Sequence, residues 1–106
     1  MIVVTMNDLP GHKITRVHGV ARGITVRSRS VLGNIGGQIQ SLFGGNLSVF
    51  TTLAETARRE ACDLMVGHAE SLGANAVIAM RYDANDIMDG ITEVLAYGTA
   101  VTVIEN

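Results

Sequence analysis

The residues of this sequence that could bind a soft metal ion are few and widely spaced. Cys62 is the single cysteine, and the three histidines are His12, His18 and His68. Cys62 and His68 are six residues apart, which on a helix separates them by about 9 Å along the axis and about 120° around it. Zinc ligands lie roughly 2.0–2.3 Å from the metal, so these two side chains cannot share one ion. A site that uses either of them needs a symmetry-related second chain.

A second group of side chains offers oxygen ligands for a harder cation. It contains Asp83, Asn85, Asp86 and Asp89, which crowd one predicted loop. The spacing differs from that of an EF-hand, because Met88 stands where glycine is required and no glutamate stands at the twelfth position. A solvated turn is therefore the simpler interpretation. The candidate metal ligands are, in chain order, His18, Cys62, His68 and Asp83. The simpler interpretations are a small buried hydrophobe for Cys62, a hydrogen-bonded core or interface imidazole for His68, and a surface or rim position for His18.

No catalytic arrangement is recognisable in the sequence. The serines cannot be placed beside a linked histidine and carboxylate, as a hydrolytic triad requires. The segment Gly33-Asn34-Ile35-Gly36-Gly37 has the glycines of a phosphate loop but lacks the GK[ST] ending. An enzyme is kept as a third hypothesis, in which His18 or Tyr97 acts with the Asp83–Asp89 loop at a subunit interface.

Composition limits the class of protein. The chain has 106 residues, of which 47% are apolar and only 4% aromatic, so we expect one domain with an aliphatic core. A net charge of -2 argues against nucleic acid or an anionic membrane as a partner. The single cysteine, the absence of a signal-peptide pattern in MIVVTMNDLP and the lack of an 18-residue apolar run predict a cytoplasmic location.

The longest regular pattern spans Thr51 to Leu72 and predicts a helix of about 33 Å. Its apolar residues fall on one stripe about 120° wide, with Cys62, Val66 and Ala69 on a minor strip beside it. Gly73 stands where a left-handed C-terminal cap is expected, and a strand should follow at once. The predicted stripe contains Phe50, Leu53, Ala54, Ala57, Ala61, Leu64, Met65, His68 and Leu72.

The remaining segments predict a small sheet. Strands are expected at Met1–Thr5, His12–Val26, Ala76–Tyr82 and Ile91–Ile104, a short amphipathic helix within Ser28–Gly45, and a polar loop at Asp83–Gly90. A bulge is expected at Arg22-Gly23, because glycine inside a strand often marks one.

The last predicted strand is apolar on both sides, unlike a strand whose sheet has one wet face. Two helices can cover only one face of such a sheet, so the other face needs a second chain. We expect Val94, Ala96 and Ala100 to be exposed in a single copy, which predicts an obligate homo-oligomer. The alternative is that a loop of the same chain covers this face.

Several segments together resemble the YbjQ-like family of small, uncharacterised bacterial and archaeal proteins labelled as heavy-metal-binding. They are MIVVT at the start, HGVARG at 18–23, Gly44-Gly45, LGANAVIAMRYD at 72–83 and YGTAV at 97–101. The sequence departs from the family pattern at Ile24, where glutamate is expected, and in its basic residues Arg22, Arg27 and Arg29. The resemblance spans nearly the whole chain, so residues 1–106 are interpreted as one YbjQ-like domain.

The resemblance implies an α+β subunit with a small antiparallel or mixed sheet, one long and one short helix, comparable to a dodecin subunit and assembling as a pentameric ring. It supplies no ligand set that can be matched residue by residue. We therefore predict a non-enzymatic homo-oligomeric binding module, with a metal ion or small molecule at inter-subunit sites and with other copies of itself as its partner. The second hypothesis is a structural or partner-protein-binding oligomer without a small ligand.

Overall fold

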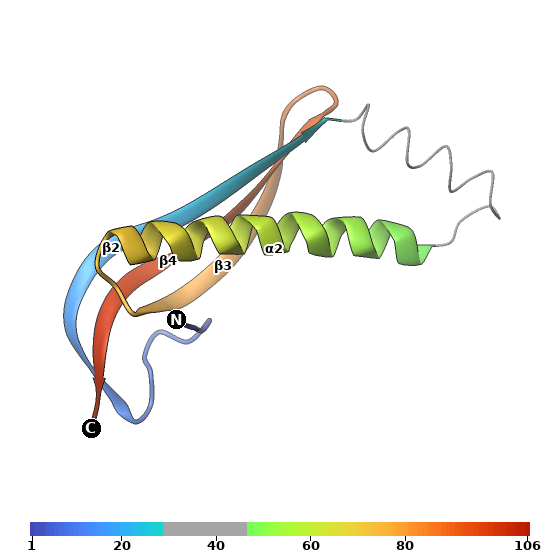
Figure 1. Cartoon of the computed structure of the whole chain (residues 1–106). Helices are drawn as coiled ribbons and strands as arrows, with labels where there is room; N and C mark the ends of the chain where they lie inside the picture. The colour runs from blue at the N-terminus through green and yellow to red at the C-terminus, as the bar shows by residue number, and fades with distance from the viewer. Residues whose placement is uncertain (29–46) are drawn as a thin grey trace.

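The computed structural model describes residues 1–28 and 47–106, with side chains for 1–27 and 51–106. Its elements are β1 (Ile2–Val3), β2 (His12–Ser28), α2 (Leu47–Ser71), β3 (Ala76–Met88) and β4 (Ile91–Glu105) (Figure 1). The strands form one sheet in the order β1-β3-β4-β2, in which only the β1–β3 pair is parallel. The predicted α+β class with a mixed sheet and one long helix is confirmed. The short helix predicted within Ser28–Gly45 lies outside the described residues, apart from Ser28.

The end of α2 follows the predicted cap. Gly73 has a φ of 92°, and its N–H donates to the Glu70 carbonyl at 3.0 Å, while the Ala74 N–H donates to the Ala69 carbonyl at 3.1 Å. These two bonds form a Schellman motif, which satisfies helix carbonyls that would otherwise lack donors. The chain therefore leaves the helix and enters β3 within four residues.

No helix in the described part of the chain is long and apolar enough to cross a bilayer.

The buried side of α2 differs in part from the predicted stripe. Its most buried side chains are Ala57, Ala61, Met65 and Ala69. Leu64 and Leu72, predicted inside, are 53% and 37% exposed, whereas Cys62 and Val66 pack against the core. The buried side of α2 is thus rotated about the helix axis towards the minor strip of Cys62, Val66 and Ala69. Alanines at the contact let the helix backbone approach the sheet closely, and the larger leucines lie outside that contact.

Gly23 is the point at which α2 comes closest to the sheet. A Cβ atom added there would overlap the Ala61 carbonyl oxygen and the Met65 amide nitrogen. The bulge predicted at Arg22-Gly23 is wrong, because the β2–β4 register runs without a shift from Gly19 to Ser28. Gly23 therefore allows α2 to pack closely on β2, and it does not bend the strand. The irregularities lie nearer the start of β2, between Ile14 and Arg16 and between Val17 and Gly19.

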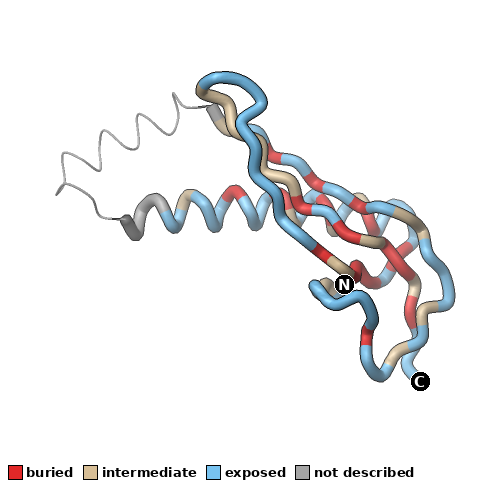
Figure 2. Tube along the Cα trace, turned by 180° about the vertical axis from the view of Figure 1, so that it is seen from behind, coloured by how far each residue is buried: buried red, intermediate tan, exposed pale blue. Residues whose placement is uncertain are grey.

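The sheet buries a different core on each face, and buried and exposed residues alternate along its strands (Figure 2). Beneath α2 lie Ala21, Val77, Met80, Ala96 and Ala100. The prediction that Ala96 and Ala100 are exposed is therefore wrong, since both have no exposed surface, and Val94 is half-buried against the same core. The opposite face buries Ala76, Ile78, Val101 and Val103 beneath the N-terminal segment, with Leu9 7% exposed. A loop of the chain thus covers this face at one end.

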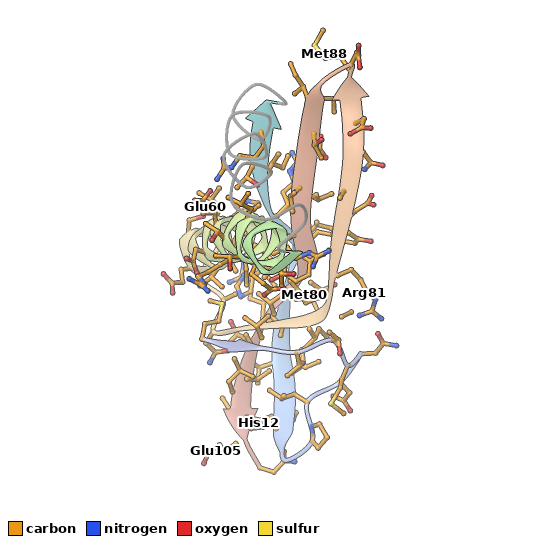
Figure 3. All side chains as sticks on the ribbon, turned by 90° about the vertical axis from the view of Figure 1, so that its right-hand side faces the viewer. His12, Glu60, Met80, Arg81, Met88 and Glu105 are labelled. Atoms are coloured by element: carbon orange, nitrogen blue, oxygen red, sulfur yellow. The ribbon has the colours of Figure 1, made fainter. Side chains whose placement is uncertain are left out.

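The polar loop predicted at Asp83–Gly90 is also wrong. β3 continues to Met88, and only Asp89 and Gly90 form the turn into β4. Pairing with β4 imposes the strand, from Arg81 opposite Tyr97 to Met88 opposite Ile91. Its sequence shows no apolar alternation because residues 81–88 are exposed on both faces. Figure 3 shows Met88 at one end of the sheet and His12 and Glu105 at the other.

The outer face of the sheet, which is the face turned away from α2, lacks cover at the hairpin end. Cross-strand pairs place Val20 beside Thr99, Arg22 beside Tyr97, and Ile24 beside Leu95 on this face. Its exposed apolar side chains there are Val20, Ile24, Val26 and Tyr97, at 65%, 44%, 50% and 37%. No other described segment packs over them. The uncovered apolar surface therefore lies mainly on β2, with Tyr97 from β4, and not on the β4 residues that we expected.

Gly23→Ala should destabilise the fold by about 3 kcal/mol or more, because the new methyl group forces α2 off β2. The matched control is Gly67→Ala on the exposed side of the same helix, where an added Cβ meets no atom within 4 Å. That change should stabilise by about 0.5–1 kcal/mol, as expected for glycine in a helix interior. Urea unfolding followed by circular dichroism measures both. Equal stability of the two variants would show that the close approach is misplaced.

Candidate functional site

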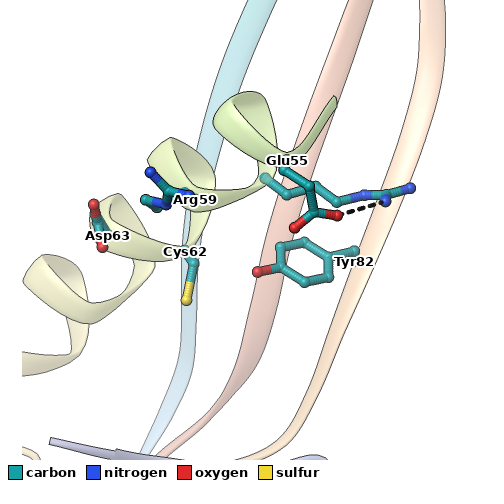
Figure 4. A pocket seen from close by; sticks show the side chains of 6 residues that line it. Glu55, Arg59, Cys62, Asp63 and Tyr82 are labelled. Atoms are coloured by element: carbon teal, nitrogen blue, oxygen red, sulfur yellow. Dashed lines mark ion pairs between the residues drawn. The ribbon is translucent and has the colours of Figure 1, made fainter. Parts of the chain in front are cut away.

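A cleft of about 440 Å³ opens between α2 and β3. It exists because α2 packs on β2 and β4 and makes few contacts with β3. Six side chains line it: Glu55, Arg58, Arg59, Cys62, Asp63 and Tyr82 (Figure 4). The volume lies in the range of small-molecule sites, which usually span several hundred Å³.

Cys62 and Tyr82 form the inner part of this cleft. The Cys62 thiol extends from the helix into the space beside the Tyr82 ring, which rises from β3 (Figure 4). Partial burial raises the pKa of the Tyr82 phenol above its ordinary value, and the charge and hydrogen bonding of Cys62 raise this pKa further. A tyrosine phenol is protonated at neutral pH even at its ordinary pKa, so Tyr82 can act as a donor to a ligand in the cleft.

The rim of the cleft carries charges of both signs. The Arg58 guanidinium lies 3.7 Å from the Glu55 carboxylate, an ion pair exposed to solvent, and Arg59 and Asp63 add one further charge of each sign. A neighbouring hollow reaches Ala84 and Val94 next to Tyr82, which gives the floor an apolar part. An apolar floor with a balanced, charged rim suits a small organic molecule that has both polar and apolar groups.

The two histidines that we considered as metal ligands have structural contacts. His68 Nδ1 accepts a hydrogen bond from the Arg22 backbone N–H at 3.1 Å, which joins the helix to β2. His18 Nε2 lies 2.7 Å from Thr102 Oγ1, and that hydroxyl donates to the Gly73 carbonyl at 3.3 Å. His18 thus supports the end of the helix through Thr102. In each ring, one of the two nitrogens is already engaged in the fold.

Asp83 lies on β3 between Tyr82 and Ala84, and its side chain takes the opposite face of the strand from theirs. Its carboxylate accepts hydrogen bonds from the Ala84 N–H at 3.0 Å and from Asn85 Nδ2 at 3.1 Å. Asp83 pairs with Leu95, whereas His18 lies where β2 pairs with Ala100 and Val101, about 15–20 Å along the strand. Within one copy, His18 and this acidic segment therefore lie apart. The third hypothesis, which places His18 or Tyr97 beside the segment at a subunit interface, stays a prediction.

The metal candidates His18, Cys62, His68 and Asp83 do not converge. No group of three or more His, Cys, Asp or Glu side chains within 1–27 and 51–106 is arranged to hold a metal ion. Cys62 is the one soft ligand in the cleft, and heavy-metal sites need several ligands at bonding distance. The described part of a single chain does not fit a heavy-metal centre.

The fold and the cleft define a class of protein. It is a small α+β domain whose helix packs on β2 and β4 and leaves a cleft along β3. A family model described as "Putative heavy-metal-binding" matches residues 1–104. The chain belongs to this family, YbjQ, as the resemblance indicated.

Relatives support the same assignment. A UPF0145 protein of Solibacter usitatus is 58% identical over 102 residues, covering 96% of this chain and 91% of its own length. A UPF0145 protein of Burkholderia thailandensis is 53% identical over 103 residues, covering 97% and 93%. The crystal structure of a DUF74-family protein from Pediococcus pentosaceus aligns with a TM-score of 0.63 over 98% of both chains. At 15% identity it supports the fold alone.

Sequence reasoning missed Tyr82 as a site residue. We expected β3 to end at Tyr82, so we did not consider that Tyr82 faces Cys62 across a cleft. The sequence did contain one indication of this site. An apolar strip beside the main stripe marks a second contact surface of the helix, and Cys62, Val66 and Ala69 form such a strip. Val66 and Ala69 enter the core, and Cys62 at the end of the strip reaches the cleft.

Cys62→Ala should lower the pKa of Tyr82 towards its ordinary value near 10, but not fully, because partial burial remains the larger cause of the rise. Phenolate absorbance against pH, recorded in a Tyr97→Phe background, reports Tyr82 alone. A raised pKa in the folded state contributes stability that is present below pH 10 and is lost as the pH rises through the folded value. Tyr82→Phe should remove this loss. An unchanged Tyr82 titration in Cys62→Ala would contradict the contact.

Proposed function

We propose that the protein is a non-enzymatic, homo-oligomeric binding module whose ligand site lies at the α2–β3 cleft and is completed by a neighbouring copy. The observation that carries this proposal is the uncovered outer face at the hairpin end of the sheet. Val20, Ile24 and Val26 are each between 44% and 65% exposed there. Contiguous apolar surface of this kind marks a protein interface.

The shape of the chain supports the same proposal. Its principal extents are 55 × 26 × 18 Å and its radius of gyration is 17.1 Å. A compact domain of about 100 residues has a radius of gyration of roughly 13 Å. An elongated and thin subunit has little interior of its own and gains most from burial against other copies. The pentameric ring expected from the family is the assembly that we propose.

The ligand that we propose is a small molecule with polar and apolar groups. Tyr82, Ala84 and Val94 would contact its apolar part, and Arg58 and Glu55 its polar part. A metal ion is the alternative ligand, and it requires Cys62 residues or other donors from several copies to meet. We propose a cytoplasmic location for this module, because a single cysteine suits a reducing compartment.

One observation favours the second candidate function, a structural or protein-binding oligomer. Ile87 and Met88 at the tip of the hairpin are 53% and 62% exposed. Methionine at an exposed tip adapts to varied partner surfaces. Isolation of a stoichiometric protein partner, lost in a Met88→Lys variant, would favour this function over small-molecule binding.

Sedimentation of the purified protein should give an oligomer, and Val20→Lys should weaken it by about tenfold or more in dissociation constant, because the change buries an unpaired charge at the interface. Thr56→Lys is the control, since Thr56 is exposed on the side of α2 away from the sheet. It should leave the oligomer intact. A wild-type protein that sediments as a monomer at all concentrations would overturn the proposal.

Calorimetric titration of the metal-free protein with Zn²⁺, Cu⁺ and Ni²⁺ separates the two ligand classes. If copies share a Cys62 site, heat should appear at less than one ion per chain and disappear in Cys62→Ala. If the site takes organic molecules, the titration should be silent, and native mass spectrometry of the oligomer should show a retained small molecule. Silence in the first with no retained molecule in the second would argue against a binding module.

A further inference from the structure

The charged side chains at the rim of the cleft do not all neutralise one another. Two of them are basic, Arg58 and Arg59, and two are acidic, Glu55 and Asp63. The Arg58 guanidinium and the Glu55 carboxylate lie 3.7 Å apart and form an ion pair (Figure 4). Arg59 and Asp63 form no ion pair or hydrogen bond with each other or with any other residue in the described part of the chain. One positive and one negative group of the cleft therefore remain for a ligand.

The order of Arg59 and Asp63 along α2 accounts for the missing ion pair between them. They are four residues apart, which places their Cβ atoms about 5–6 Å from each other on neighbouring turns. At this spacing an ion pair is weaker when the basic residue comes first than when the acidic residue comes first. Glu55 precedes Arg58, and those two side chains do pair. Arg59 and Asp63 gain little from each other, so a ligand group of opposite charge is the better partner for each.

A smaller hollow of about 70 Å³ adjoins the cleft, and Arg58 and Tyr82 line both spaces. Ala84 and Val94 supply apolar surface to this hollow. Tyr82 is 44% exposed, so part of its ring stays open to a ligand that extends from the cleft into the hollow. A ligand held at the rim by its charged groups can therefore place a short aliphatic side chain against Tyr82 and Val94.

We propose that the α2–β3 cleft binds a free α-amino acid with an aliphatic side chain. Its carboxylate pairs with the Arg59 guanidinium, whose planar donors match a carboxylate through two parallel hydrogen bonds. Its ammonium group pairs with the Asp63 carboxylate, and its side chain lies against Tyr82 and Val94. This inference rests on the proposed function, and it names the class of ligand that the same cleft takes.

The two unpaired charges select a ligand that carries both signs. A simple carboxylic acid satisfies Arg59 but brings uncharged surface against the Asp63 carboxylate, and removing water from an unpaired charge is costly. A simple amine does the same to Arg59. Glu55 and Arg58 border the same polar groups of the ligand. Because these two side chains already neutralise each other, they do not decide its charge.

Calorimetric titration of the full-length protein with four compounds tests the proposal. The compounds are L-leucine, N-acetyl-L-leucine, which lacks the ammonium group, L-leucine amide, which lacks the carboxylate, and glycine, which lacks the side chain. L-leucine should bind, and the acetyl and amide forms should each bind about threefold more weakly or worse, as expected for one exposed ion pair lost. Glycine should bind about tenfold more weakly or worse, because it buries no aliphatic group.

Two variants assign each charge of the ligand to its residue. Arg59→Gln should abolish the preference for L-leucine over its amide and keep the preference over N-acetyl-L-leucine. Asp63→Asn should do the reverse. The matched controls are Arg16→Gln on β2 and Glu70→Gln on α2, which remove exposed charges outside the cleft and should leave all four affinities unchanged.

The outcomes separate this inference from the proposed function. If L-leucine does not bind while the oligomer retains another small molecule, the amino-acid site is overturned and the binding module stands. Equal affinity for L-leucine, its amide and its acetyl form overturns the site in the same way, as does an equal loss for all three compounds in Arg59→Gln. A monomeric wild type overturns the oligomeric module, and selective binding of L-leucine to that monomer would still support the site.

Discussion

The close contact between α2 and β2 at Gly23 is the constraint on which the rest of the structure depends. The helix can rest on β2 only because glycine in the strand faces an alanine seam in the helix, with Ala61 and Met65 directly above. A helix held this close to one edge of a narrow sheet cannot also cover the other edge. The cleft along β3 and the exposure of Tyr82 therefore follow from the same contact that stabilises the subunit.

Local signals predicted the parts of the fold that local interactions determine. The helix, its glycine cap and the immediate strand after it were all recoverable, because the Schellman bonds of Gly73 and Ala74 involve only neighbouring residues. The strand at 83–88 was not recoverable. Its residues are polar, and they are held extended by β4, which follows later in the chain. The rotation of the buried stripe likewise depends on which residues of β2 the helix meets.

The candidate site could be predicted only as a set of residue types. Sequence spacing alone separates Cys62 from His68, because helix geometry sets the distance and the angle between them. It could not show that His68 accepts a bond from Arg22 or that Cys62 lies beside Tyr82, since each contact joins segments at least 20 residues apart. The histidines drew attention by their chemistry, but in the fold they connect the last turns of the helix to the sheet.

The segments on which the family resemblance rests mainly form packing contacts and hydrogen bonds within this chain. In LGANAV, Gly73 caps the helix, and Asn75 forms a paired contact with β4, its Nδ2 donating to the Val103 carbonyl and its Oδ1 accepting from the Val103 N–H. In YGTAV, a Cβ at Gly98 would collide with Val77. These contacts specify how helix and sheet meet, and hence which edges stay open. Similarity in such segments therefore supports the fold of the subunit, and it identifies no ligand.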